Sequence, residues 1–235
     1  AALLAATLGV GRSQRYRLYQ PVFLGLLIMI IAISLDWVFA TYLIKNLGVN
    51  GSTPVGSAIQ KVNEFVIIVS VVISLTLLSG GSLGSIYIQK GNLKLGLIVG
   101  CGTFLLAAAG STMMADFLFK GKNLTLERII SWLPWLLIFV LANAAEEELL
   151  FRGLFLRKLQ PFYGKFLSNA LIAFVFSFLH YGVNYTSNDL MFLTATTVVA
   201  LVWGALMQKT DSIWGSILFH AGMDIPILLG IFSNL

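Results

Sequence analysis

Long apolar stretches are the feature of this sequence that most restricts its fold. A helix needs about 20 mostly apolar residues to cross the hydrocarbon core of a bilayer. Seven stretches approach or exceed that length: 21–44, 63–87, 94–118, 129–159, 166–183, 190–208 and 212–232. We therefore expect an all-α, polytopic transmembrane helix bundle of about seven spans, or eight if residues 1–10 belong to a further helix. Gly80 and Gly81 are expected to end the second span early.

The composition excludes a soluble domain. Of the 235 residues, 58% are hydrophobic and 11% are charged, whereas soluble domains carry about 25% charged residues. The net charge of +5 comes from dispersed basic residues, so we expect no nucleic-acid partner. Cys101 is the only cysteine, which leaves neither a disulfide framework nor a cysteine metal cluster. We expect one membrane-embedded domain over residues 1–235.

Basic residues between the spans indicate how the chain crosses the membrane, because cytoplasmic loops carry an excess of Lys and Arg. With the N-terminus inside, and with Arg152 left out, nine basic residues fall on the inner side and five on the outer side. The inner set is Arg12, Arg15, Arg17, Lys90, Lys94, Arg157, Lys158, Lys165 and Lys209; the outer set is Lys45, Lys61, Lys120, Lys122 and Arg128. We expect a cytoplasmic N-terminus, and the compact loops favour a bacterial cytoplasmic membrane.

Few polar side chains interrupt the spans, and several of them reach one depth. The set is Asp36, Glu146, Glu147, Glu148, Arg152, His180, His220 and Asp224. A charge at bilayer depth costs roughly 3 to more than 10 kcal/mol, so these groups should face the interior of the bundle. At about 1.5 Å per residue, Glu147 and His180 lie roughly 18 and 22 Å from the inner ends of their helices. His220 and Asp224 lie roughly 13 and 20 Å from theirs, which predicts a shared site.

Spacing gives the neighbouring glutamates different partners. Residues four apart lie on one helix face, so Glu148 can pair with Arg152 while Glu147 points about 100° away. We therefore expect Glu148 to be neutralised and Glu147 to be free for chemistry. Glu146 is expected to be a solvated or helix-packing neighbour. Asp36 has no such partner and is expected to be a helix–helix polar contact or an interface residue.

Three short motifs in the C-terminal third resemble those of one protein family. EELLFR at 147–152, FSFLH at 176–180 and HAGMD at 220–224 are similar to the EExxxR, FxxxH and HxxxN or HxxxD motifs of the CAAX protease and bacteriocin-processing (CPBP or Abi) family. They follow the order of that family. The resemblance implies an intramembrane glutamate endopeptidase like CAAX prenyl protease 2, with its catalytic core in 129–232.

The resemblance also implies roles for the motif residues. Glu147 would be the general base that activates water, and His180 would help to hold that water. His220 and Asp224 would stabilise the oxyanion. The supporting residues would be Glu148 and Arg152. Asp224 stands where the best-known members carry asparagine, although the family accepts either residue, and an ionised aspartate cannot donate a hydrogen bond to an oxyanion. It could instead orient His220, or act while protonated.

Other functions fit parts of this pattern. Two histidines and nearby carboxylates could bind zinc, but no HExxH helix is present and the resemblance favours a metal-independent glutamate, so we expect no cofactor. A non-proteolytic immunity or regulatory scaffold would retain the same fold. Intramembrane acids and histidines also form relays in transporters, although paired inverted repeats would then be expected in both halves of the chain.

The leading hypothesis is hydrolysis of a peptide bond by a glutamate-activated water. The expected partners are the lipid bilayer and a membrane-associated or lipidated protein or peptide. Bacteria generally lack prenylated CAAX proteins, so the name of the family does not identify the substrate.

Overall fold

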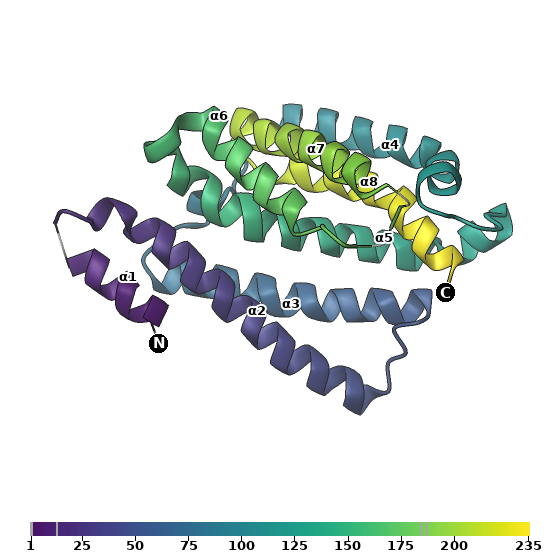
Figure 1. Ribbon diagram of the computed structural model, residues 1–235, viewed down its shortest axis with the longest axis horizontal. Coiled ribbons are helices and arrows are strands. Elements are labelled where there is room, and N and C mark those ends of the chain that lie inside the picture. Colours follow the sequence, from purple (N-terminus) through teal and green to yellow (C-terminus); the bar gives the residue numbers. More distant parts are fainter. Residues whose placement is uncertain (1, 13, 184, 187) are drawn as a thin grey trace.

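The computed structural model describes residues 2–12, 14–183, 185–186 and 188–235 (Figure 1). Its α-helices are α1 (Ala2–Arg12), α2 (Gln20–Leu47), α3 (Pro54–Leu78), α4 (Leu93–Leu118), α5 (Leu126–Glu148), α6 (Leu154–Phe178), α7 (Asp189–Thr210) and α8 (Trp214–Ser233). Two 3-10 helices, η1 (Arg17–Tyr19) and η2 (Leu83–Ile86), and one π-helix, η3 (Leu149–Gly153), complete the order. No β-strand occurs among the described residues, so the predicted all-α fold is confirmed.

Among the residues that the structure describes, six helical stretches are long and apolar enough to cross a membrane. The longest, Leu126–Phe178, joins α5, η3 and α6 over 53 residues. Within it, Gly164 leaves the helical conformation, with φ 70° and ψ 179°, shortly after Pro161. This one stretch therefore contains two predicted spans, 129–159 and 166–183, and the polytopic helical bundle is confirmed. The described part of α1 has 11 residues, whereas a crossing helix has about 20.

The second span differs most from its predicted limits. α3 begins at Pro54, and its N-cap Thr53 accepts a hydrogen bond from the amide of Gly56 at 3.0 Å. The helix ends at Leu78, and Gly80 follows with φ 82°, which agrees with the expected early end. Lys61, predicted to lie in an outer loop, instead lies within α3 with its side chain 13% exposed. The predicted outer set thereby falls from five basic residues to four, against nine in the predicted inner set.

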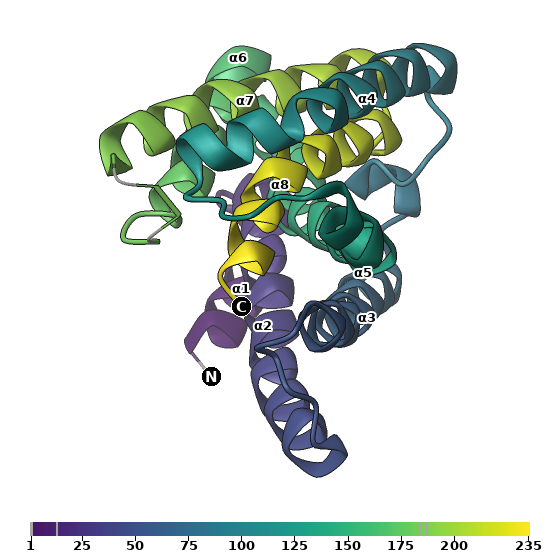
Figure 2. The same cartoon turned by 90° about the vertical axis from the view of Figure 1, so that its right-hand side faces the viewer.

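The helices form two layers, with α8 in the middle of the larger one. α8 is the most buried of the candidate spans and packs against α4, α5 and α7. α3 packs against both α5 and α2, so α2 and α3 lie on the side of α5 away from α7 (Figures 1 and 2). Residues of α5 and α8 are therefore placed in the interior of the bundle.

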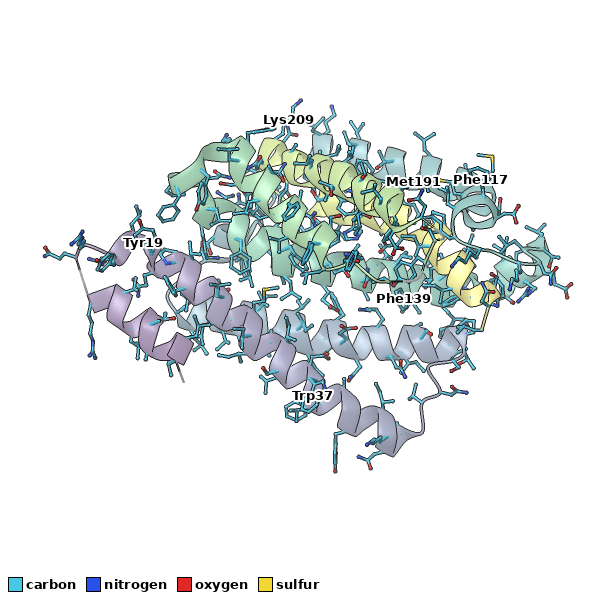
Figure 3. The ribbon with its side chains drawn as sticks, viewed as in Figure 1. Tyr19, Trp37, Phe117, Phe139, Met191 and Lys209 are labelled. Atoms are coloured by element: carbon cyan, nitrogen blue, oxygen red, sulfur yellow. The ribbon has the colours of Figure 1, made fainter. Side chains whose placement is uncertain are left out.

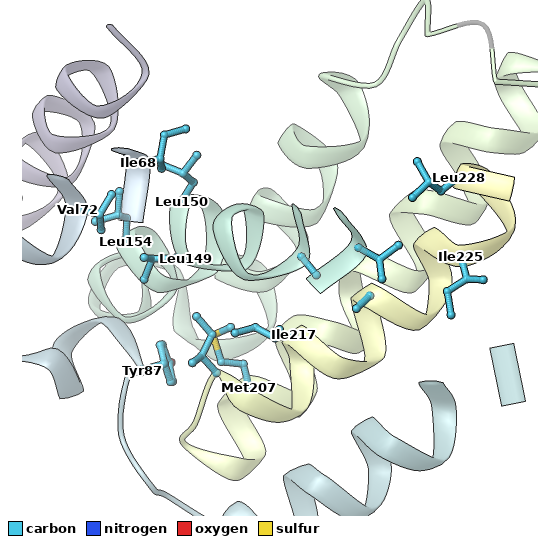
Figure 4. Packing of buried hydrophobic residues seen from close by; sticks show 14 of the residues in the cluster. Ile68, Val72, Tyr87, Leu149, Leu150, Leu154, Met207, Ile217, Ile225 and Leu228 are labelled. Carbon is cyan, nitrogen blue, oxygen red and sulfur yellow. The ribbon is translucent and has the colours of Figure 1, made fainter. Parts of the chain in front are cut away.

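Buried apolar residues of α3 pack against the segment that follows the glutamates. Ile68 and Val72 of α3 lie beside Leu150 and Leu154 (Figure 4), and all four are buried. Lipid tails are as apolar as these side chains, so within a membrane such contacts act through close packing rather than through the hydrophobic effect. This packing holds η3 and the start of α6 against α3.

One end of the bundle collects basic residues that were predicted for the inner side. Arg157 pairs with Asp211 after α7, and Gln89 Nε2 donates to the Asp211 carboxylate at 2.6 Å. Gln208 Nε2 donates to the Lys165 carbonyl at 2.9 Å. The segments after α3, before the second half of α6 and after α7 therefore meet at one end, as alternating crossings require.

Small residues allow α4 and α8 to approach closely. A Cβ built on Gly100 would lie 2.7 Å from the Gly215 carbonyl oxygen and 2.9 Å from Leu218 Cβ. A Cβ on Gly102 of the same helix would meet nothing within 4 Å. Small residues at such crossings are the usual means of close helix packing in membranes.

We predict that Gly100→Ala lowers the free energy of unfolding by about 1–3 kcal/mol, because the added methyl group must push the backbone of α8 away. Gly102→Ala is the matched control and should change it by less than about 1 kcal/mol. Thermal unfolding in detergent measures both. Equal effects of the two substitutions would contradict the close contact.

Candidate active site

A cavity of about 330 Å³ brings together all four residues predicted to be catalytic. It is lined by Glu147 of α5, His180 from the turn after α6, and His220 and Asp224 of α8. Aromatic and aliphatic side chains form most of the remaining wall; Phe139, labelled in Figure 3, is one of them. The three helical segments thus meet at one site, as the estimated depths predict.

Arg152 provides the buried cation of this region. Its side chain is fully buried, and Nη1 donates to Glu148 Oε1 at 2.6 Å. Nη2 donates to the Ala200 carbonyl at 3.4 Å. The guanidinium also lies 4.6 Å from the ring centre of Phe176 and 5.2 Å from that of Trp203, within the range of cation–π attraction. The Glu148–Arg152 pair predicted from the spacing is therefore present.

The π-helix η3 follows directly after the three glutamates. The amide of Leu154 donates to the carbonyl of Leu149, five residues earlier. Such wide turns are rare and occur frequently at functional sites. A Cβ on Gly153 would lie 2.9 Å from Leu149 Cδ1 and 3.3 Å from the Ile86 carbonyl oxygen. Glycine at the end of η3 therefore lets η2 approach the helix beside the site.

Two contacts fix the orientation of the His220 ring, a hydrogen bond at Nδ1 and stacking on Trp203. Nδ1 lies 2.9 Å from Glu148 Oε1, and because a carboxylate paired with Arg152 can only accept, Nδ1 carries the proton. The ring stacks on Trp203 with centres 3.8 Å apart and planes 15° apart. Nε2 consequently points toward Glu147 Oε2 and Asp224 Oδ1, each 3.5 Å away.

Glu147 differs from both of its neighbours in sequence. Its side chain is 21% exposed and lines the cavity, whereas Glu146 and Glu148 are buried. Glu148 is paired with Arg152. The carboxylate of Glu147 is thus the one of the three that can meet a molecule in the cavity.

His180 also has one nitrogen fixed by the backbone. Nδ1 lies 2.8 Å from the carbonyl oxygen of Phe176, one turn earlier. A carbonyl oxygen accepts only, so Nδ1–H donates to it and Nε2 keeps its lone pair. Since His180 lines the cavity, that lone pair can accept a hydrogen bond from water or substrate.

Asp224 has an amide partner that the motifs did not reveal. Its Oδ2 accepts from Asn143 Nδ2 at 3.0 Å, and its Oδ1 lies 3.5 Å from His220 Nε2. Asn143 lines the same cavity. A position four residues before Glu147 shares its helix face, so the spacing in α5 could have indicated Asn143. For Trp203 on α7, no sequence signal stands out from the surrounding apolar span.

Glu146 is not solvated. It is buried, and its Oε2 lies 3.9 Å from Lys61 Nζ, which pairs with Glu64 Oε2 at 2.5 Å. Of the two environments expected for Glu146, the structure shows the helix-packing one, against α3. Asp36 lies on α2, which packs on α3, and its Oδ1 is buried without a hydrogen-bond partner among the described atoms.

The segment that carries the three motifs matches the model of a known protein family. Residues 129–226 match the model of the family described as Rce1-like, type II CAAX prenyl endopeptidase Rce1-like. The matched segment runs from α5 into α8 and includes EELLFR, FSFLH and HAGMD. The resemblance noted from the motifs is therefore confirmed. Neither the curated proteins nor the solved structures include a match to the chain.

We predict that Arg152→Met lowers the free energy of unfolding by about 3–5 kcal/mol, because the substitution leaves the Glu148 carboxylate buried without its cation. Arg157→Met is the matched control, since the Arg157–Asp211 pair is partly exposed; its loss should cost less than about 1 kcal/mol. Thermal unfolding in detergent measures both variants. A small loss for Arg152→Met would contradict the assigned buried ion pair.

Proposed function

We propose that the protein is an intramembrane endopeptidase that uses a glutamate-activated water, because residues 129–226 match the model of the Rce1-like type II CAAX prenyl endopeptidase family. The observation that carries the proposal is the different environment of two adjacent carboxylates. Glu148 is buried against Arg152, while Glu147 lines a cavity together with both histidines and Asp224. A free carboxylate in a partly desolvated site is suited to act as a general base.

The proposed reaction begins with a water molecule held between Glu147 and His180 Nε2. Glu147 accepts a proton from this water, and the water oxygen bonds to the carbonyl carbon of the scissile peptide. The oxyanion that forms needs hydrogen-bond donors directed at it. His220 can provide one from Nε2 when its ring carries both protons. The C–N bond then breaks, and the proton held by Glu147 passes to the leaving nitrogen.

The walls of the cavity support an apolar substrate segment. Phe119, Phe139 and Phe192 line it together with aliphatic side chains, so a peptide with apolar residues beside the scissile bond would be well accommodated. We propose a membrane-associated protein or peptide as substrate, lipidated or not. The protein would work in a bacterial cytoplasmic membrane, which its compact loops favour, with its N-terminus in the cytoplasm, as the distribution of basic residues indicates.

We also propose that the reaction needs no metal ion. Among the described residues, no three His, Cys, Asp or Glu side chains are grouped in the way that metal ligands are. Nδ1 of His220 already binds Glu148. A water activated by Glu147 alone is consistent with this set of side chains.

We predict that Glu147→Gln lowers kcat by at least about 100-fold, because the amide cannot accept the proton from water. The unfolding temperature should stay unchanged. The assay uses liposomes with the reconstituted protein and internally quenched peptides that carry apolar residues around the scissile bond, with and without a farnesylated cysteine.

Glu146→Gln is the matched control for this assay, since it makes the same change one residue away and outside the cavity; it should keep most of the cleavage rate. Normal cleavage by Glu147→Gln would show that Glu147 is not the base. A cellular phenotype that survives Glu147→Gln would instead favour the scaffold alternative.

We predict that EDTA and dipicolinate leave the cleavage rate unchanged. Glu147 activates the water without a Lewis acid in the proposed mechanism, so removal of metal ions has no step to affect. The control is a zinc protease assayed in the same liposomes. Loss of cleavage with chelator, and its recovery on addition of zinc, would establish the zinc-dependent alternative.

A further inference from the structure

Asn143 and Asp224 form a pair of side chains at the edge of the cavity. Asn143 lies one helical turn before Glu147 on α5, and Asp224 lies one turn after His220 on α8. Asn143 Nδ2 donates to Asp224 Oδ2 at 3.0 Å. Both side chains line the cavity, so the pair joins α5 and α8 beside Glu147 and His220.

The chemistry of the two groups fixes how the amide is turned. An ionised carboxylate can only accept hydrogen bonds, whereas an asparagine amide has two N–H donors and one carbonyl acceptor. The amide must therefore present its nitrogen to Asp224, and its oxygen must point away. One N–H is used by Asp224 Oδ2, and the second N–H remains.

Asp224 itself is a poor candidate for an oxyanion donor. When ionised it has no proton to donate, and its negative charge would repel a developing oxyanion. Its two oxygens already have neighbours: Oδ2 accepts from Asn143, and Oδ1 lies 3.5 Å from His220 Nε2, which can donate to it when the ring carries both protons. Asp224 is therefore placed to hold two neighbouring groups rather than to bind the reacting carbonyl.

We propose that Asn143 is a catalytic residue that donates its second amide N–H to the oxyanion, while Asp224 is a positioning residue that orients this amide. This assignment rests on the proposed peptidase function. Asparagine at 143 would then supply, from α5, the neutral donor that the aspartate on α8 cannot supply.

The assignment also explains why a polar amide stands at this position in a membrane helix. Asn143 is half-buried and lines the cavity, and Asp224 accepts from only one of its two N–H groups, so the second is left for a molecule in the cavity. The neighbouring positions Ala142 and Ala144 are apolar and buried, so this face of α5 presents polar groups to the cavity at Asn143 and, one turn later, at Glu147. Asn143 and Glu147 would contact opposite parts of one reacting peptide group, its oxygen and its attacking water.

Exchange of the two groups tests the pair. The experiment measures kcat and KM in reconstituted liposomes with the quenched peptide that the unmodified protein cleaves fastest, and the unfolding temperature of each variant. Asn143→Asp removes the donor and sets two carboxylates against each other, so kcat should fall by about 100-fold or more and the unfolding temperature should fall. Adding Asp224→Asn to that variant restores an amide–carboxylate pair, and should return kcat to within about ten-fold of the starting protein.

A third variant separates donation from packing. Asn143→Leu keeps the approximate shape but has no N–H, so we expect kcat to fall by about 100-fold with KM nearly unchanged. Asn46→Asp, which alters an exposed amide near the end of α2, is the matched control and should leave both constants unchanged.

Two results would overturn the inference. One is Asn143→Leu with an unaltered kcat, and the other is a double exchange that is no better than Asn143→Asp in both kcat and unfolding temperature. If the unmodified protein cleaves no peptide, the proposed function fails. In that case the catalytic role of Asn143 fails with it. The unfolding temperatures of the variants still decide separately whether Asn143 and Asp224 form the pair.

Discussion

The buried guanidinium of Arg152 is the interaction on which the rest of the site depends. A charge without partners in an apolar interior costs several kcal/mol, so the surrounding groups must face it. Glu148 supplies a carboxylate, Ala200 a carbonyl, and Trp203 an aromatic face. These contacts come from α5, α7 and η3, and Glu148 passes the constraint to His220 on α8. One cation thereby fixes the positions of several helices and the orientation of one imidazole.

The three consecutive glutamates show how a helix gives identical residues different chemistry. Successive side chains point about 100° apart, so each faces a different part of the bundle. Glu146 faces Lys61 of α3, Glu147 faces the cavity, and Glu148 faces Arg152 and His220. The first and third are buried in packing contacts. The middle one lines the cavity and is partly exposed, so it is the carboxylate of the three that a molecule in the cavity can contact.

Hydrogen bonds to the backbone and to buried carboxylates set the proton positions in the site. Phe176 O fixes Nδ1–H of His180, and Glu148 fixes Nδ1–H of His220. In both rings Nε2 is therefore the nitrogen left to face the cavity. Asn143 and Asp224 extend the same principle, because a carboxylate that can only accept determines which end of the amide faces it. The site is thus oriented by partners outside the three motifs as well as by the motifs themselves.

The sequence by itself determined the membrane-spanning helical fold, the Glu148–Arg152 pair and the candidate residues Glu147, His180, His220 and Asp224. Apolar run length and the four-residue spacing of a helix are local properties, and they can be read without knowledge of the fold. Only the tertiary structure decided that Lys61 lies inside α3 against Glu146, that Trp203 stacks on His220, and that Asn143 holds Asp224. Each of these contacts joins residues at least 17 positions apart in sequence, and which faces of two helices meet depends on the packing of the whole bundle rather than on either segment alone.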